Sequence, residues 1–259
     1  KVPVFLIAQR MFTGLDSFPL LAIPLFMIAG SLMDRGGISK RLIHLASCIV
    51  GNVTGGLALV AVLACMFFAA ISGSAPATVV AIGSIMVPAM IKAGYDKDFA
   101  LGLMAAAGTI GVIIPPSIPF VTYGITMNTS IGKLFMAGVV PGLIMGVSLM
   151  LLCYLIAKKR GYKGNVKPTL ASFMAALKES IWGLMMPLII LGGIYGGIFT
   201  PTEAATVACV YSLLVGVFVH KELTYKETVK SFSEAGITSA MVMLIISTAT
   251  AMGWIMTTE

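Results

Sequence analysis

Three hydroxyl side chains stand close together inside a long uncharged tract. Residues 42–91 contain no Asp, Glu, Lys or Arg, yet the stretch SGSAPAT at 72–78 places Ser72, Ser74 and Thr78 beside a glycine and a proline. Gly and Pro are unfavourable in a helix interior, and non-helical backbone at membrane depth survives only where it is buried in protein or lines a wet cavity. The stretch therefore predicts a binding site.

A second interruption follows about 30 residues later and has the same character. The sequence GTIGVIIPPSIP at 108–119 puts three prolines and two glycines inside another uncharged block. Two such breaks expose helix ends, backbone carbonyls and hydroxyls near the middle of a membrane, which suits a small cation and an anionic solute. The alternative is that these hydroxyls only bond to the preceding helical turn or pack between helices.

These residues must be positioned by membrane helices. The chain has 259 residues, 58% hydrophobic and 10% charged, and lipid offers no hydrogen-bond partners to an open strand edge, so we expect an all-α integral membrane fold. The uncharged blocks are 42–91, 99–132, 134–157, 180–202 and 235–258. Because a crossing needs about 20 apolar residues, they predict roughly six or seven crossings or re-entrant segments.

The basic residues indicate how the first break is arranged. The loop KKRGYKGNVK at 158–167 carries Lys and Arg but no acidic residue, which predicts a cytoplasmic position. If SGSAPAT is the tip of a re-entrant hairpin, every Lys and Arg except Lys1, Arg10 and Lys133 is also cytoplasmic. A straight crossing would move Arg35, Lys40 and Arg41 outside, so the charge distribution favours the hairpin.

Several other classes of function are disfavoured. The basic residues border apolar blocks and form no stripe with interleaved aromatics, so we expect no nucleic-acid partner. Cys48, Cys65, Cys153 and Cys209 lack CxxC spacing and are expected to be small buried hydrophobes. No HExxH, GxSxG or phosphate-loop motif occurs, which argues against an enzyme and against ATP as the energy source within this chain. An ion gradient is the natural alternative.

Isolated polar residues near the apolar blocks are expected to be structural. Glu203 in FTPTEAA fits the first turn of a helix capped by Thr200 or Thr202, with a role in the solute pathway as the alternative. His44 and His220 lie near charged segments and are expected to face the membrane interface.

Five stretches together resemble a known family. They are PLFMIAGSLMDRGGISKRL, AAISGSAPATVVAIGSIMVPAMIKAGY, GTIGVIIPPSIPFVTYG, SIGKLFMAGVVPG and GGIYGGIFTPTEAA. Their sequence and order are similar to those of the large membrane subunit (M-type, DctM-like) of tripartite ATP-independent periplasmic (TRAP) transporters. The resemblance runs through almost the whole chain, which is expected to be a fragment of a longer protein.

The resemblance implies a sodium-coupled importer of organic acids, of the sialic acid or C4-dicarboxylate type, in the bacterial inner (cytoplasmic) membrane. Its implied partners are a periplasmic substrate-binding protein and a small four-helix membrane subunit. Its implied fold has inverted repeats, each with a re-entrant hairpin and a broken helix, and it moves solute by an elevator motion. A binding-protein-independent sodium/dicarboxylate symporter is the closest alternative, and a structural or assembly subunit is another.

The family pattern also implies roles for single residues. The implied substrate-binding residues are Ser72, Gly73, Ser74, Thr78, Pro115, Pro116 and Ser117. The implied sodium ligands are Ser72, Ser74, Gly108, Thr109, Gly111, Val112 and Pro115. The implied parts are scaffold and arm helices in 1–50, the transport hairpin and broken helix in 51–132, a span with a basic loop and arm in 133–180, and the truncated start of a second inverted repeat in 181–259.

Overall fold

The computed structural model describes residues 3–164 and 169–258, and this part of the chain is helical, without a strand. The α-helices are Val4–Thr13 (α1), Ala22–Arg35 (α2), Ile38–Val50 (α3), Gly56–Ser72 (α4), Ala75–Lys92 (α5), Lys97–Gly108 (α6), Ile118–Thr126 (α7), Ile131–Arg160 (α8), Leu170–Tyr195 (α9), Pro201–Leu214 (α10) and Tyr225–Thr258 (α11). Three short turns join them: Phe18–Leu21 (η1) and Thr109–Val112 (η2), both 3-10, and the π-helical Val215–Val219 (η3).

Six of the described segments are long and apolar enough to cross a membrane. They are Phe18–Arg35, Ala75–Lys92, Ile131–Arg160, Leu170–Tyr195, Pro201–Val219 and Tyr225–Thr257, and the shorter Gly56–Ser72 is also apolar. Large apolar side chains of α8, such as Val140, Ile144 and Leu151, are exposed on its surface, as lipid-facing positions require. The predicted all-α, multi-span membrane fold is confirmed.

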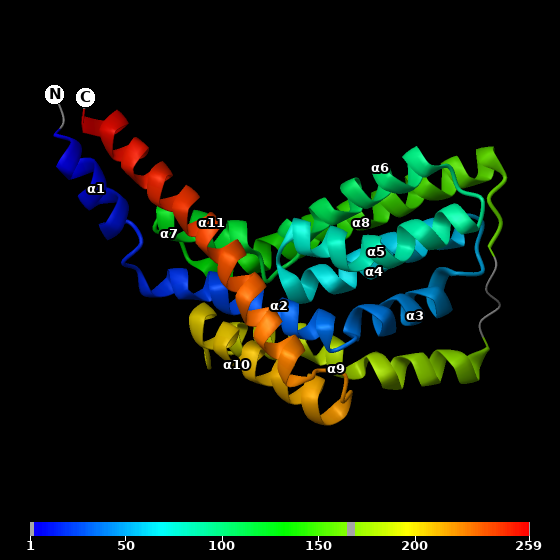
Figure 1. Cartoon of the computed structure of the whole chain (residues 1–259). Coiled ribbons are helices and arrows are strands. Elements are labelled where there is room, and N and C mark those ends of the chain that lie inside the picture. Colours follow the sequence, from blue (N-terminus) through cyan, green and yellow to red (C-terminus); the bar gives the residue numbers. More distant parts are fainter. Residues whose placement is uncertain (1–2, 165–168, 259) are drawn as a thin grey trace.

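Helices α4 and α5 form a hairpin rather than a straight crossing. They run side by side in opposite directions, so that the start of α4 and the end of α5 lie at the same end of the molecule (Figure 1). The turn between them is Gly73, whose φ of 61° lies in the left-handed region that glycine adopts without a Cβ penalty. The hairpin expected from the charge distribution is therefore present, and the straight helix is wrong.

The second predicted interruption is also present. Helix α6 ends at Gly108, η2 continues for one tight turn, and the chain is not helical again until α7 begins at Ile118. Ser117 precedes α7 and its side chain accepts a hydrogen bond from the backbone N–H of Phe120, at 3.4 Å. Proline removes a backbone donor and disfavours helix in the residue before it, which explains why the helix stops here.

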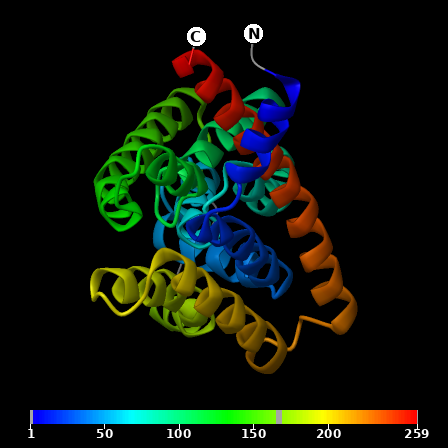
Figure 2. The ribbon, with the colours of Figure 1, turned by 90° about the vertical axis from the view of Figure 1, so that its left-hand side faces the viewer.

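Helix α2 lies at the centre of the molecule in both views of the ribbon (Figure 1, Figure 2). On one side it packs against α10 and α11, and on the other it meets α4. Helix α4 is the most enclosed element, because α3, α5, α6 and α8 all contact it. Helix α1 returns along the far end of α11, which brings the first and last described helices together (Figure 1).

Two helices run across places where the sequence suggested a change of element. Helix α9 begins at Leu170 and continues through the expected boundary between residues 180 and 181. Helix α11 is continuous from Tyr225 to Thr258, so its polar first turns, as far as Glu234, and the following uncharged block form one helix. The end of the basic loop, including Lys167, lies outside the described residues, as does Lys1.

The structural expectations for isolated residues are confirmed where they can be checked. Thr200 caps α10, and the Glu203 carboxylate accepts from the Thr200 backbone N–H at 2.7 Å in a reciprocal capping box. All four cysteines are free thiols; three are buried and Cys209 is half-buried.

Candidate functional site

The hairpin tip brings three oxygen atoms together. The Ser72 hydroxyl lies 3.2 Å from the Thr78 hydroxyl, and the Thr78 hydroxyl donates to the carbonyl of Ser74 at 2.8 Å. Ser72 and Thr78 are almost completely buried, with 2% and 0% exposure, whereas Ser74 is half-buried. Thr78 lies one helical turn after Ser74, so the left-handed turn at Gly73 and the start of α5 place all three residues on one side of the tip.

The two interruptions meet, backbone against backbone. The N–H of Ile118 donates to the carbonyl of Gly73 at 3.2 Å. A Cβ atom on Gly73 would lie 2.5 Å from the carbonyl oxygen of Pro116, and a Cβ on Gly111 would lie 2.7 Å from the Thr78 hydroxyl oxygen. Glycine is needed at both positions for this approach, and segments about 40 residues apart in sequence thereby form one junction.

The remaining predicted residues of the break differ in how deeply they are buried at this junction. Pro115, Pro116 and Ser117 are buried, and the Ser117 hydroxyl donates to the carbonyl of Val112 at 2.5 Å. Gly108 is buried against α5, where a Cβ would overlap the side chain of Val79.

Thr109 differs from its predicted neighbours. Its side chain is exposed, and its hydroxyl donates to the carbonyl of Ala106 at 2.7 Å. This back-bond to the preceding turn is the alternative that the sequence left open for the hydroxyl residues. The Thr109 hydroxyl is therefore already bonded within its own helical turn.

The oxygen atoms of the junction are hydroxyls and carbonyls, which are the ligands that a hard cation prefers. The residues that fit a sodium ion best are Ser72, Ser74 and Thr78, because their oxygens already converge. In the described part of the chain, His, Cys, Asp and Glu form no group of three that could hold a metal ion.

A cavity of about 280 Å³ adjoins the hairpin tip on the side of α2 and α11. Ser72 and Ser74 form one wall together with Pro76 and Ala77 at the start of α5. The opposite wall comes from Gly30, Ser31 and Asp34 of α2 and from Glu234 and Thr238 of α11. Of the predicted substrate-binding residues, Ser72 and Ser74 line this cavity, while Gly73, Thr78, Pro115, Pro116 and Ser117 lie outside its lining.

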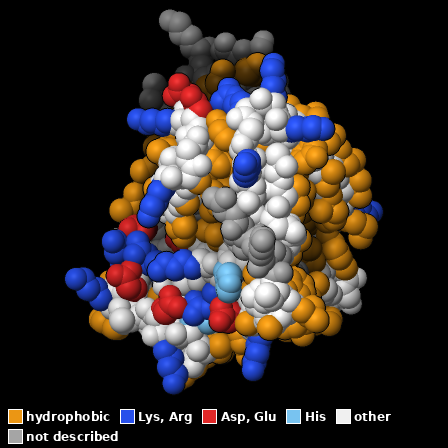
Figure 3. Space-filling view, turned by 90° about the vertical axis from the view of Figure 1, so that its right-hand side faces the viewer, with side chains coloured by type: hydrophobic (Ala, Val, Ile, Leu, Met, Phe, Trp, Pro, Cys, Tyr) orange, Lys and Arg blue, Asp and Glu red, His pale blue; other side chains and the backbone are white. Residues whose placement is uncertain are grey.

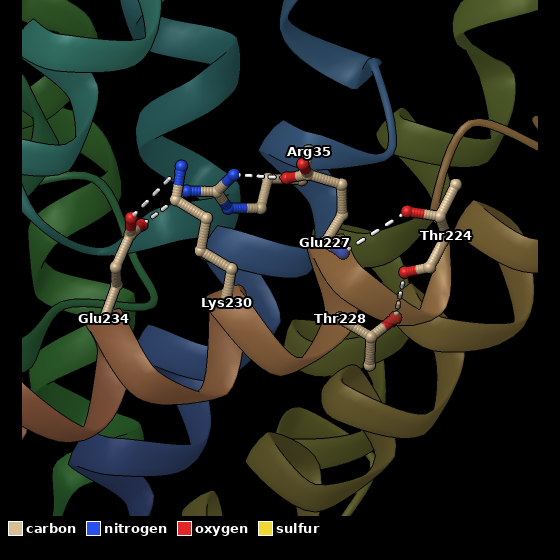
Figure 4. Close-up of polar contacts among 6 residues, drawn as sticks. All are labelled: Arg35, Thr224, Glu227, Thr228, Lys230 and Glu234. Atoms are coloured by element: carbon tan, nitrogen blue, oxygen red, sulfur yellow. Dashed lines mark hydrogen bonds and ion pairs between the residues drawn. The ribbon is translucent and has the colours of Figure 1, made fainter.

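An ionic cluster holds the far wall of the cavity in place (Figure 4). The Arg35 guanidinium donates to Glu227 and, at 2.6 Å, to Glu234, so one side chain of α2 joins two carboxylates on α11. Lys230 lies 4.0 Å from Glu234. The first turn of α11 is supported by Thr224, whose hydroxyl accepts from the backbone N–H of Glu227 at 3.3 Å.

Sequence reasoning missed Asp34 and Glu234 as cavity residues. Both lie where a charged stretch borders an apolar block, and the charge rule assigns a meaning only to the basic residues of such stretches. Asp34 accepts a hydrogen bond from the Ser39 hydroxyl, and Glu234 is held by Arg35. Their contact with one cavity depends on the packing of α2 beside α11, which are about 200 residues apart in sequence.

A family model described as "Tripartite ATP-independent periplasmic transporter, DctM component" matches residues 1–259. The chain belongs to the DctM family. It is 54% identical over 260 residues to the isethionate TRAP transporter permease protein DctMQ of Oleidesulfovibrio alaskensis, covering 100% of this chain and 41% of that protein. It is 46% identical over 253 residues to the C4-dicarboxylate TRAP transporter large permease protein DctM of Pseudomonas aeruginosa, covering 98% and 59%.

A third DctM relative has a different named solute. The sialic acid TRAP transporter large permease protein SiaM of Vibrio cholerae is 43% identical over 252 residues, covering 97% of this chain and 59% of that protein. The chain thus spans about 40% to 60% of the length of these three curated relatives. DctM membership and the apolar helices place this chain as a multi-pass protein of the bacterial inner membrane.

Proposed function

We propose that this DctM chain is the permease part of a sodium-coupled importer of organic acids that depends on a periplasmic binding protein and a small membrane subunit. The observation that carries the proposal is the junction of the two interruptions, with converging oxygens and a cavity on one side. The names of the relatives contain isethionate, C4-dicarboxylate and sialic acid, all of them organic acids. No catalytic step is part of the proposal.

The sodium ion binds at the junction. Ser72 and Thr78 supply hydroxyl oxygens, and the Ser74 carbonyl supplies a third ligand. The carbonyls of the facing break, between Gly108 and Pro115, complete the set of ligands. An ion held between the tip and the break joins two elements that otherwise share few hydrogen bonds, so sodium binding stabilises their contact.

The organic acid binds in the cavity. Helix α5 begins at Ala75 with Ser74 as its N-cap, and its first turn lines the cavity through Pro76 and Ala77. The N-terminus of a helix attracts anions because its backbone N–H groups lack partners within the helix. The carboxylate of the solute therefore faces the hydroxyls of Ser72 and Ser74, and the bound sodium ion lies on the other side of the same tip.

The motion that carries the solute takes place between two groups of helices, one that moves and one that stays fixed. Helices α4–α7 form the transport group, which contains the hairpin and the break, and they lie within the region 51–132 predicted for this role. Helices α2, α10 and α11 form the frame, in which α10 and α11 both pack on α2. The cavity lies between the two groups, so an elevator movement of the transport group along α2 takes the site with it.

The proposal is tested by transport in proteoliposomes. The intact permease, with its small subunit, is assayed for uptake of labelled isethionate, a C4-dicarboxylate and sialic acid, with and without a sodium gradient and the binding protein. We expect uptake of one of these acids that requires both. Uptake that needs sodium but not the binding protein would assign the chain to the binding-protein-independent symporters, and uptake without a sodium gradient would refute sodium coupling.

The site itself is tested by Ser72→Ala and Ser74→Ala. The matched control is Ser84→Ala, because Ser84 lies further along α5, the helix that Ser74 caps, and its hydroxyl donates to the carbonyl of Ala81, away from the tip. We expect the first two changes to raise the sodium concentration needed for half-maximal uptake and the control to leave it unchanged. A structural or assembly role for the chain predicts equal sodium dependence in all three variants.

A further inference from the structure

A cleft separate from the candidate transport site opens where α3, α9 and the connection between η3 and α11 meet. Its volume is about 560 Å³. Lys40, Arg41 and His44 of α3 form one side, Lys178 and Trp182 of α9 form another, and His220 lies at the connection. Figure 3 shows Lys, Arg, Asp, Glu and His side chains gathered on the face that contains this end of the molecule.

Basic side chains outnumber acidic ones in the cleft, which Lys40, Arg41 and Lys178 line together with Glu179 and Glu222. Arg41 pairs with Glu222 at 2.6 Å, and His44 lies 3.7 Å from Glu179. Within the described residues, Lys40 and Lys178 have no ion-pair partner. Two exposed ammonium groups therefore remain for an external anion.

An unpartnered polar atom lies on the same cleft. The Nε2 atom of His220 is buried and has no hydrogen-bond partner within the described part of the chain. A buried polar atom without a partner costs free energy that a bound hydrogen-bonding group recovers. The phosphate group of a lipid has the acceptor oxygens that an imidazole N–H requires.

The cleft lies at the boundary between water and membrane. The candidate span Pro201–Val219 ends immediately before His220, and the uncharged block of α9 begins at Ser180, two residues after Lys178. Basic residues concentrate at this boundary, which the charge rule assigns to the cytoplasmic side. The ligand of the cleft is thus within reach of the cytoplasmic leaflet.

Exposed side chains of α9 continue from the cleft toward the apolar part of the helix. Lys178, Trp182, Met185 and Leu188 are spaced by four, three and three residues, which places them on one helical face. Trp182 is 42% exposed, Met185 40% and Leu188 64%. The face passes from an ammonium group through an indole to apolar side chains, in the order in which a phospholipid passes from headgroup to acyl chain.

We propose that this cleft binds an anionic phospholipid of the cytoplasmic leaflet, with its phosphate between Lys40 and Lys178 and its acyl chains along Trp182, Met185 and Leu188. The lipid joins α3 to α9 at the corner where both meet the connection to α11. This inference does not depend on the identity of the transported solute or on sodium coupling.

The test compares lipids of different charge on the intact permease. The purified, delipidated protein is titrated with phosphatidylglycerol or phosphatidylcholine, and lipid adducts are counted by native mass spectrometry. We expect phosphatidylglycerol to bind more tightly, and the double variant Lys40→Gln/Lys178→Gln to weaken its binding by about 25-fold, or about fivefold for each lysine near the surface. The matched control is Lys92→Gln/Lys97→Gln, which removes two exposed lysines after the hairpin and should leave the titration unchanged.

Four results would overturn the proposal. Equal affinity for the two lipids would show that the cleft does not select an anionic headgroup. Equal weakening of phosphatidylglycerol binding by the control variant would show that Lys40 and Lys178 have no specific role. Displacement of phosphatidylglycerol by inorganic phosphate assigns the cleft to a soluble anion. A photo-reactive amino acid in place of Trp182 that cross-links to a polypeptide in membranes, rather than to lipid, assigns the face to a protein partner. Unchanged thermal unfolding of the lipid-free double variant shows that its fold is intact.

Discussion

The close approach of the hairpin tip to the break predicts a large effect for Gly73→Ala. Gly73 has a φ of 61°, and a left-handed backbone costs an L-residue about 1–2 kcal/mol. The new Cβ would also lie 2.5 Å from the carbonyl oxygen of Pro116. That oxygen belongs to the main chain and cannot rotate away, so the tip and the break must separate by several tenths of an ångström.

Gly94→Ala separates these two effects. Gly94 has a φ of 85°, but a Cβ there would meet nothing within 4 Å. The control variant therefore carries the backbone strain alone, about 1–2 kcal/mol. Gly73→Ala adds an overpacking cost of about 1–3 kcal/mol, which includes weakening of the hydrogen bond from Ile118 to the Gly73 carbonyl at 3.2 Å.

The additional destabilisation of the junction by Gly73→Ala should also weaken sodium binding. If the ion needs the tip and the break in contact, its affinity falls by at most the factor that corresponds to 1–3 kcal/mol, about 5- to 150-fold. The assay is thermal unfolding of the intact permease in detergent, titrated with sodium chloride and, separately, with choline chloride. We expect Gly73→Ala to lose the sodium-specific stabilisation and Gly94→Ala to retain it. Equal unfolding temperatures and equal sodium responses would refute the coupling between the junction and the ion.

Three further changes have expected outcomes in the same unfolding assay. Thr78→Val removes the hydroxyl that contacts the Ser72 hydroxyl at 3.2 Å and the Ser74 carbonyl at 2.8 Å, while the Ser72 hydroxyl keeps its contact with the Ser74 carbonyl at 3.5 Å. We therefore expect a loss of about 1 kcal/mol for each lost hydrogen bond and a weaker sodium response. An unchanged response would remove Thr78 from the ion site. Arg35→Gln leaves Glu227 and Glu234 without the guanidinium that pairs with both. Because both carboxylates are partly exposed, we expect the free energy of unfolding to fall by about 1 kcal/mol for each lost ion pair. This loss should be smaller at high choline chloride, which screens the charges, and a loss that does not depend on salt would contradict the reasoning. Burial lowers the pKa of His220 below the ordinary histidine value of 6.5. The unfolded chain therefore takes up a proton first as pH falls, and stability decreases through about pH 6.5 until His220 is also protonated in the folded state. His220→Gln should flatten this pH dependence, and an unchanged slope would count against His220 as its source.

The hairpin and the break were predictable because residues that interrupt a helix are rare within apolar membrane segments and are easily recognised there. A soluble protein uses Gly, Ser and Pro in many surface turns, but within an uncharged membrane block these residues need a protein-buried environment. The distribution of Lys and Arg then favoured the hairpin over the straight helix. Glu203 was predictable for a local reason as well, since a capping box depends on residues only three apart.

The far wall of the cavity was not predictable, because it depends on tertiary packing. Asp34 and Glu234 come together only because α2 packs beside α11, and no local pattern in either segment signals the other. The extent of α9 was missed for a different reason. Its polar beginning and apolar remainder suggested a boundary near 180, yet the segment around Ser180 contains neither Gly nor Pro until Gly183, and a change of polarity alone does not end a helix.

The packing at the seam between the transport group and the frame is compatible with sliding. Gly30 of α2 faces Ser72, where a Cβ would lie 3.1 Å from the Ser72 Cα atom. Small residues at this point let α2 and the tip approach closely without interlocking side chains. The tip is meanwhile bonded to the break through Gly73 and Ile118, while Arg35 ties α2 to α11. The polar bonds described here therefore lie within each group, and the cavity occupies the seam between them, where a bound solute would be carried by one group and exposed by movement past the other.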